Sequence, residues 1–162
     1  MTFSIRPCTL ADLDALTEIE EKSFPPEEKA SRERFKERLA AFGDCFLILE
    51  DDGKPVGLID GMVTNSEVIE DPMFENAALH DPQGAIQSVF GLCVLPEYRC
   101  RGGAAMLMEA FIEKAKREGR KAVILTCKER LIPYYSKFGF ENKGVSGSVH
   151  GGAQWYDMIL WL

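Results

Sequence analysis

The sequence predicts one α+β domain built on a mixed, mostly antiparallel sheet flanked by helices. Two strand-like runs flank Asp51-Asp52-Gly53-Lys54, whose Asp-Gly pair is typical of a hairpin turn. Residues 86–126 form a strand-helix-strand unit, which requires a parallel, right-handed crossover. The chain has 162 residues, of which 46% are hydrophobic, so it can bury one sizeable core but is too short for two ordinary domains. We therefore expect residues 1–162 to form a single domain.

The N-terminal third is expected to contain a short strand and two helices. Residues 3–6 have strand character, and Thr9 is placed to cap the first helix. Pro25 and Pro26 must end that helix, because proline cannot continue it and constrains the residue before it. Ser31 can then cap a second helix. The inward residues expected from helical spacing are Leu13, Leu16 and Ile19, followed by Phe35, Leu39 and Phe42.

The middle of the chain is expected to contain the hairpin, an irregular segment and a central strand. The hairpin strands cover residues 45–49 and 56–63. Residues 66–82 are polar, acidic and irregular, and we interpret them as a loop over the site. Residues 85–95 return to an apolar, strand-like composition that ends at Pro96.

The C-terminal half is expected to alternate helices and strands. Residues 103–118 have the composition and spacing of a strong helix. A buried strand follows at 121–126, and then a helix over 128–137 that Pro133 interrupts. The chain closes with a strand over 154–162. From the first of these helices we expect Met106, Ala110, Phe111 and Ala115 to face the core, with Glu113 paired to Arg117 on the outside.

Composition argues against several classes of protein. The net charge of −7 disfavours a nucleic-acid partner, because no general phosphate-binding surface is available. No run of about 18 apolar residues occurs, and residues 1–10 lack the pattern of a secretory signal, so we expect a cytoplasmic protein without a membrane partner. Five cysteines and two histidines show no close pairing, which predicts reduced thiols and no metal site.

The most informative segment is a basic, glycine-containing loop at residues 99–105. A strand leads into this loop and a long helix follows it, so backbone N–H groups and the helix dipole can face a phosphate. Gly102 and Gly103 allow close approach because they lack a Cβ. The spacing matches neither the nucleotide P-loop nor the dinucleotide fingerprint. Taken alone, these glycines could also form only a turn.

Arg99-x-x-Gly102-x-Ala104 resembles the R/Q-x-x-G-x-G/A signature of GNAT acetyltransferases, and the preceding V-L-P-E-Y-R is typical of them. The wider chain resembles the arylalkylamine (serotonin) N-acetyltransferase branch in its non-vertebrate form. Residues 18–31 resemble that branch's substrate-side segment, and residues 125–140 its catalytic segment. The resemblance implies a GNAT-like acyl-CoA N-acyltransferase fold, with acetyl-CoA as cosubstrate and no metal.

The resemblance also implies which residues hold the cofactor. Backbone groups of Leu92 and Val94 would bind the pantetheine arm, and the amides of residues 100–105 the pyrophosphate. Tyr135 falls at the family tyrosine beside the thioester sulfur, where a phenol can protonate the departing thiolate. Tyr134 is the neighbouring alternative. The expected cofactor-binding residues are Leu92, Cys93, Val94, Arg99, Cys100, Arg101, Gly102, Gly103, Ala104 and Ala105.

The group that accepts the proton of the amine is less well defined. Vertebrate enzymes of the branch use two histidines of the central strand, and Ser88 and Phe90 stand at these positions here. Glu28 is the first candidate to replace them, followed by Glu27 and His80, although each could instead only attract the ammonium group or lie on the surface. The expected substrate-binding residues are Phe24, Pro25, Glu27, Ser88, Phe90 and Thr126.

The expected function is that of an N-acetyltransferase of the EC 2.3.1 type, acting by direct attack in a ternary complex. The substrate would be a small primary amine, arylalkylamine-like or polyamine-like. The alternatives are acetylation of protein N-termini or lysines, and a non-catalytic regulator that binds acyl-CoA. A covalent route through Cys93 or Cys127 is disfavoured, because cysteines in strands usually serve packing. A monomer and a homodimer both remain open.

Overall fold

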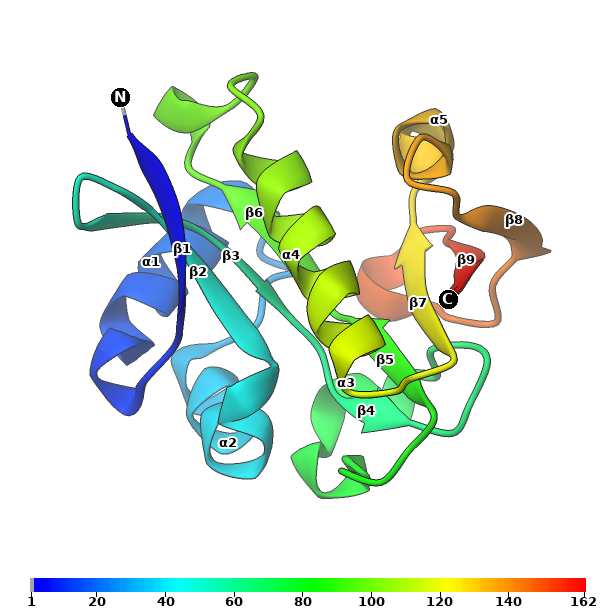
Figure 1. The fold of residues 1–162 in the computed structure, drawn as a ribbon. Helices are drawn as coiled ribbons and strands as arrows, with labels where there is room; N and C mark the ends of the chain where they lie inside the picture. Colours follow the sequence, from blue (N-terminus) through cyan, green and yellow to red (C-terminus); the bar gives the residue numbers. More distant parts are fainter. Residues whose placement is uncertain (1) are drawn as a thin grey trace.

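The computed structural model describes residues 2–162 and contains two adjoining sheets with helices on both faces (Figure 1). The strands are β1 Phe3–Pro7, β2 Phe46–Asp51, β3 Lys54–Asp60, β4 Val63–Thr64, β5 Ile86–Val89, β6 Gly91–Val94, β7 Ala122–Cys127, β8 Glu141–Val145 and β9 Tyr156–Trp161. The helices are α1 Leu13–Ser23, α2 Arg32–Phe42, α3 Asp71–Glu75, α4 Gly103–Arg117 and α5 Ile132–Ser136.

The strand order confirms the predicted fold class. The first sheet has the order β1-β2-β3-β6 and the second β4-β5-β7-β9-β8. β5 and β7 pair in parallel across α4, whereas the other pairs are antiparallel. No helix in the described part of the chain combines the length and apolar character that a membrane span requires.

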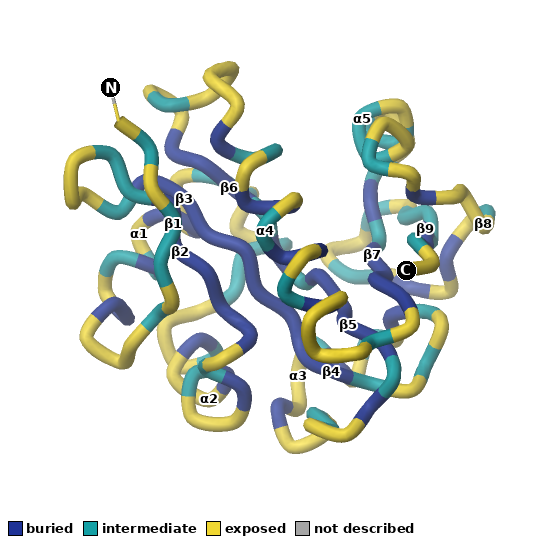
Figure 2. Tube along the Cα trace, viewed as in Figure 1, coloured by how far each residue is buried: buried dark blue, intermediate teal, exposed yellow. Residues whose placement is uncertain are grey.

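The core forms between the first sheet and helices on both of its faces. On β2, the Phe46 ring packs against Phe35 and Phe42 of α2, with ring centroids 6.3 and 5.9 Å away. Leu49 of the same strand meets Gly103, the first residue of α4, on the opposite face, because residues an odd number of positions apart in a strand point to opposite sides. Figure 2 shows the central strands β2 and β3 largely buried.

The predicted turns and caps form locally. The β2–β3 hairpin turns at Asp52 and Gly53, with φ of 47° and 84°, as a type I′ turn requires. The Ser31 hydroxyl accepts a hydrogen bond from the Arg34 N–H at 3.1 Å and caps α2 as predicted. Gly119, with φ of 76°, follows the end of α4.

Several details of α4 and α5 differ from the predictions. Met106 is exposed, because the buried stripe of α4 passes through Leu107 and Phe111 instead. Glu113 pairs with Lys116 at 3.5 Å, and no pairing with Arg117 forms. Pro133 lies in the first turn of α5 rather than breaking a longer helix, because its missing N–H is not needed there.

The irregular segment predicted at 66–82 contains α3 and a 3₁₀ turn at Ala77–Leu79. Arginines of α2 hold this segment: Arg38 donates to the Phe74 carbonyl at 3.1 Å, and Arg34 donates to the Glu75 carbonyl. A carboxylate of Asp71 in turn accepts hydrogen bonds from Ser148 and Val149 near the C-terminus. The segment therefore links α2 to the C-terminal region.

The strand expected over 85–95 is interrupted at Phe90. The Phe90 N–H donates to the Asp60 carbonyl at 2.7 Å, although Gly91 is the register partner of Asp60. Two residues thus oppose one, as in a β-bulge. Before the bulge β5 pairs with β7, whereas after it β6 pairs with β3 and with no other strand of the described chain. As a result β6 and β7 diverge (Figure 1).

Candidate active site

A cavity of about 330 Å³ lies where β6 and β7 diverge. Its volume is in the range of small-molecule sites. Residues from both strands, from the ends of α1 and α2, from α3 and from the C-terminal region contribute to its wall. The lining includes Glu20, Phe24, Glu28, Arg34, Arg38, Phe74, Phe90, Gly91, Leu92, Thr126, Cys127, Tyr135, His150 and Trp155.

The free edge of β6 adjoins this cavity. The Leu95 N–H donates to the Val56 carbonyl of β3. Cys93, two residues earlier, is the register partner of Leu58, so its backbone groups also point toward β3. The alternating antiparallel pattern therefore turns the backbone groups of Leu92 and Val94 away from β3. Within the described residues no strand pairs with β6 on that side. The Arg99 side chain donates a hydrogen bond to the Val94 carbonyl at 3.0 Å. The N–H group of Val94 then remains to bind a ligand.

The loop after β6 presents an uncapped helix N-terminus. No side chain caps α4, so the N–H groups of Gly103, Ala104 and Ala105 have no acceptor within the helix. Cys100 and Gly102 have φ of 62° and 84°, and a Cβ on Gly102 would meet nothing within 4 Å. This open, basic turn suits a phosphate group.

Gly103 has a different reason to lack a side chain. It is buried, and a Cβ there would lie 2.6 Å from Leu49 Cδ2. The missing side chain therefore allows α4 to pack closely on β2. The residues predicted for coenzyme A thus include the N–H groups of the free β6 edge and of the α4 N-terminus, and hydrogen-bond donors of this kind suit an extended, phosphorylated ligand.

Tyr135 of α5 lines the cavity beside Cys127. Its ring packs against Tyr134 and Phe140, with centroids 5.2 and 6.1 Å away. Burial raises the pKa of the Tyr135 phenol above its ordinary value, so the hydroxyl keeps its proton at physiological pH. It can therefore act as a hydrogen-bond donor in the cavity.

Glu28 lines the cavity, but its carboxylate is already paired. Lys128 donates to Glu28 Oε2 at 2.8 Å, and the Glu28 side chain is 10% exposed. The His150 ring donates from Nε2 to the Glu28 carbonyl at 3.0 Å. This network joins the loop after α1 to the C-terminal region. Glu28 thus links two walls of the cavity.

Aromatic rings form one wall of the cavity. Phe74 stacks on His150 with centroids 4.9 Å apart and meets Phe90 at 5.0 Å. His150 therefore belongs to this wall, and its carbonyl accepts a hydrogen bond from the Trp155 indole at 2.8 Å. Phe24 contributes from the end of α1. The surface suits an apolar or aromatic group.

Glu20 is the functional candidate that the sequence interpretation missed. It lies on α1, lines the cavity and is only 5% exposed. Its Oε2 accepts a hydrogen bond from the Ala30 N–H at 2.9 Å. Burial raises the pKa of Glu20 to about 7, which the Ala30 hydrogen bond partly offsets. A carboxylate that titrates near neutrality in a cavity is a suitable general base.

A signal for Glu20 was present in the sequence. Glu20 follows Leu13 and Leu16 at the i+7 and i+4 positions, so it lies on the apolar stripe of α1. A carboxylate in such a stripe is notable, because Glu and Asp side chains are rarely buried unless they are paired. The same applies to Asp60 at the end of the apolar strand β3, which is 1% exposed.

Several predicted substrate residues lie outside the cavity. Ser88 is fully buried, and its hydroxyl donates to the Met62 carbonyl at 2.8 Å. Pro25 and Glu27 are exposed on the loop after α1 and do not line the wall. Phe24, Phe90 and Thr126 do line it. Cys93 is buried and burial raises the pKa of its thiol, which disfavours a covalent route.

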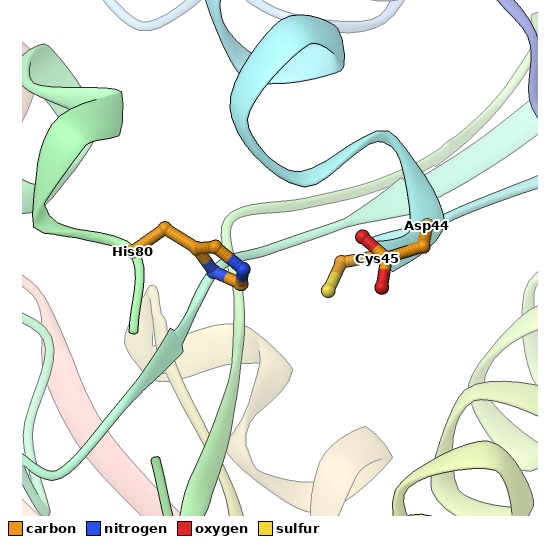
Figure 3. A group of neighbouring side chains, drawn as sticks. All are labelled: Asp44, Cys45 and His80. Atoms are coloured by element: carbon orange, nitrogen blue, oxygen red, sulfur yellow. The ribbon is translucent and has the colours of Figure 1, made fainter. Parts of the chain in front are cut away.

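His80 lies away from the cavity, next to Asp44 and Cys45 (Figure 3). Its Nδ1 accepts the Val63 N–H at 3.0 Å, so the neutral ring carries its proton on Nε2 and neither nitrogen offers a lone pair. Burial also raises the pKa of the Cys45 thiol to about 12. This cluster is therefore poorly suited to hold a metal ion.

The matched family agrees with this geometry. Residues 13–140 match the acetyltransferase (GNAT) family, and the chain belongs to it. An uncharacterised N-acetyltransferase of Methanocaldococcus jannaschii is 30% identical over 157 residues, which cover 89% of this chain and 63% of that protein. Serotonin N-acetyltransferase of Mesocricetus auratus is 26% identical over 95 residues, or 58% of this chain and 44% of that enzyme. The chain thus spans less than two thirds of both relatives.

The fold is shared with solved structures. GphF, a GNAT-like decarboxylase in complex with isobutyryl-CoA, superposes with a TM-score of 0.84 at 22% identity, covering 98% of each chain. At this identity the likeness concerns the fold.

Proposed function

We propose that this protein transfers the acetyl group of acetyl-CoA to a small primary amine that carries an apolar or aromatic tail. The observation that carries the proposal is the position of Glu20, a buried carboxylate in a cavity walled by Phe74, Phe90 and Trp155. An ammonium group would be attracted to the carboxylate, and its tail would pack on the rings. Family membership and the resemblance to serotonin N-acetyltransferase support the same choice.

The cofactor site is proposed along β6 and the start of α4. The free N–H groups of Leu92 and Val94 would bind the pantetheine arm, and the amides of residues 100–105 the pyrophosphate. When bound, acetyl-CoA supplies an acetyl group activated as a thioester. The edge of β6 next to Gly91 and Leu92 would bring that group to the cavity, which both residues line.

In the proposed mechanism Glu20 removes a proton from the ammonium group, so that the neutral amine can attack. Tyr135 remains protonated and donates a hydrogen bond to the sulfur as the thiolate leaves. Glu28, held by Lys128 and His150, would fix the wall of the cavity against which the substrate packs. Thr126 would contact the substrate from the β7 side.

A bulky acceptor is disfavoured by the way the cavity is enclosed. The segment at 146–155 is tied to Asp71 through Ser148 and Val149 and to Glu28 through His150. A cavity of about 330 Å³ that is bounded on this side by these bonds accommodates a small molecule. Peptide and lysine acetylation are therefore the second choice, and an acyl-CoA-binding regulator without turnover is the third.

An amine panel tests the proposal. Isothermal titration with acetyl-CoA would be followed by thiol release on adding phenethylamine, tryptamine, spermidine and a short peptide. We expect binding, and the fastest thiol release with an arylalkylamine. Release with the peptide alone would favour the second choice, and binding without release the regulator. No binding would contradict the proposal at its first step.

A further inference from the structure

Two buried carboxylates approach Gly91, the residue that follows the bulge at Phe90. A Cβ added to Gly91 would lie 3.1 Å from Asp60 Oδ1 and 3.6 Å from Glu20 Oε1. Glu20 comes from α1 and Asp60 from the end of β3, so tertiary packing alone brings them together. The missing side chain of Gly91 leaves a small space that both oxygens face, which we call the Gly91 slot.

Asp60 has unused hydrogen-bonding capacity in this slot. Its Oδ1 is buried and has no hydrogen-bond partner in the described part of the protein. Its Oδ2 lies 3.4 Å from Arg38 Nη1. A buried carboxylate oxygen without a donor is unfavourable, and so the slot requires a proton, a water molecule or a ligand cation.

The charges around the slot leave one negative charge in excess. Arg38 of α2 is the cation that faces the two carboxylates, and its guanidinium also lies over the Phe90 ring at 4.9 Å. Cys93 of β6 and Cys8 after β1 lie near enough to be influenced. Burial raises the pKa of both thiols, so they remain neutral. Two ionised carboxylates and Arg38 would together attract one further positive charge.

We propose that Glu20 and Asp60 act as one proton-accepting unit across the Gly91 slot, in which Glu20 receives the proton of the amine and Asp60 shares it. This inference rests on the proposed function. Glu20 is the catalytic residue, because it lines the cavity, and Asp60 is a positioning residue behind it. The summed charge of the bound amine and the carboxylate pair stays constant during this step, because the proton only moves from the ammonium group to the pair.

The proton balance of the full reaction is simple. The ammonium gives its first proton to the carboxylate pair, and the neutral amine forms the N–C bond as the C–S bond breaks. The second nitrogen proton ends on the thiolate, by way of Tyr135 or solvent. The pair then releases its proton to solvent, which restores the starting state.

Carbon-13 NMR of the carboxyl groups in the free protein tests the shared proton directly. We expect Glu20 and Asp60 each to report both titration steps, as coupled groups do. In Asp60→Asn, Glu20 should show one step with its midpoint lower by roughly one pH unit, because a like charge is lost. Independent single steps, or an unmoved Glu20 midpoint, would overturn the inference.

Two further variants keep the test decisive. Gly91→Ala fills the slot next to Asp60 and should uncouple the two titrations, which is informative if Asp60→Asn fails to fold. Asp157→Asn is the matched control: Asp157 also has a buried Oδ1 without a partner, but it belongs to β9. It should leave the titration of Glu20 unchanged, and a shift there equal to that of Asp60→Asn would contradict a specific role for Asp60.

The pH dependence of kcat/KM for the amine tests whether the carboxylate pair acts in the reaction. In Asp60→Asn the acidic limb should move to lower pH by the same amount as the NMR midpoint, with the affinity for acetyl-CoA unchanged. An acidic limb that stays in place would remove Asp60 from the reaction. Coupled titration in a wild-type protein that acetylates no amine would overturn the proposed function and the acceptor role, while the shared proton would stand.

Discussion

Glu20 is a buried carboxylate with a raised pKa. Burial raises its pKa to about 7 from a model-peptide value near 4.5, so folding favours the protonated form. The contribution of Glu20 to stability is therefore fully present below the unfolded pKa and is lost as pH rises through the folded value. This loss of stability falls in the pH range in which the proposed base must be ionised.

Replacing Glu20 should therefore stabilise the protein at alkaline pH. In Glu20→Gln the neutral amide can still accept the Ala30 N–H, but it avoids burying a charge. We expect the free energy of unfolding to rise at pH 8, by up to about 3 kcal/mol, and to match the wild type at pH 4. Urea unfolding at both pH values measures this, and an equal change at the two would show that charge is not the cause.

Tyr135 is the second residue with a role of its own. Tyr135→Phe keeps the packing against Tyr134 and Phe140 but removes the hydroxyl. We predict that kcat falls by about 100-fold, because the donor acts on the leaving thiolate, while the Kd of acetyl-CoA changes little. Single-turnover kinetics and calorimetry separate these effects. Tyr134→Phe is the matched control and should retain most of the activity.

At the scale of elements, the turn before α4 is the feature to test. Gly102→Val places a β-branched side chain at φ of 84°, next to the proposed phosphate site. We expect the Kd of acetyl-CoA to rise by at least about tenfold, through strain and loss of access.

The other end of α4 provides the control for this change. Gly119 also has a positive φ, 76°, and a Cβ added there would meet nothing within 4 Å. Gly119→Val should cost similar stability but leave the Kd of acetyl-CoA unchanged. Equal losses of affinity in the two variants would indicate a general effect of backbone strain and would contradict the phosphate assignment.

The wall formed by the loop after α1 and the C-terminal region gives a further prediction. Glu28→Gln weakens the pair with Lys128, which is 2.8 Å long, and the bond from His150 to the Glu28 backbone remains. The KM of the amine should rise about threefold to tenfold, and the pH profile of kcat should stay in place. A shifted acidic limb would instead make Glu28 the base.

Turns and helix caps could be predicted from the sequence more readily than the bulge that interrupts a strand. The hairpin at Asp52 and Gly53 follows from local turn chemistry, and the cap at Ser31 from one side chain. The bulge at Phe90 was not predicted, because residues 85–95 have the composition of one continuous strand and the extra residue is visible only against the partner strand. Met106 was misplaced because the apolar residues of α4 permit two neighbouring stripes.

At the scale of the whole molecule, the cavity depends on segments far apart in the sequence. The basic loop at 99–105 was predicted from one local motif, so it could be found from the sequence. Glu20, Asp60 and Gly91 come from three separate elements, and only tertiary packing places them together. Ser88 was assigned to the cavity from its position in the strand, but the alternation of the strand directs it to the Met62 carbonyl.

Opposite charges contribute at the two proposed binding places. The loop at 99–105 carries Arg99 and Arg101 beside the proposed phosphate site, whereas the buried carboxylates of Glu20 and Asp60 lie at or next to the proposed amine site. A chain with a net charge of −7 can in this way bind an anion and a cation at adjoining places. High salt should therefore weaken both steps, because each depends on opposite charges.

The central claim is that Glu20 is the proton acceptor for acetyl transfer, and one measurement tests it most directly. The rate of thiol release from acetyl-CoA with an arylalkylamine would be followed from pH 6 to 9 in wild type and Glu20→Gln, with acetyl-CoA binding measured in parallel. We predict that the wild-type rate rises through a midpoint near pH 7, and that Glu20→Gln binds acetyl-CoA normally but loses at least about 100-fold in rate near neutrality. A variant with the wild-type rate and pH profile would contradict the claim.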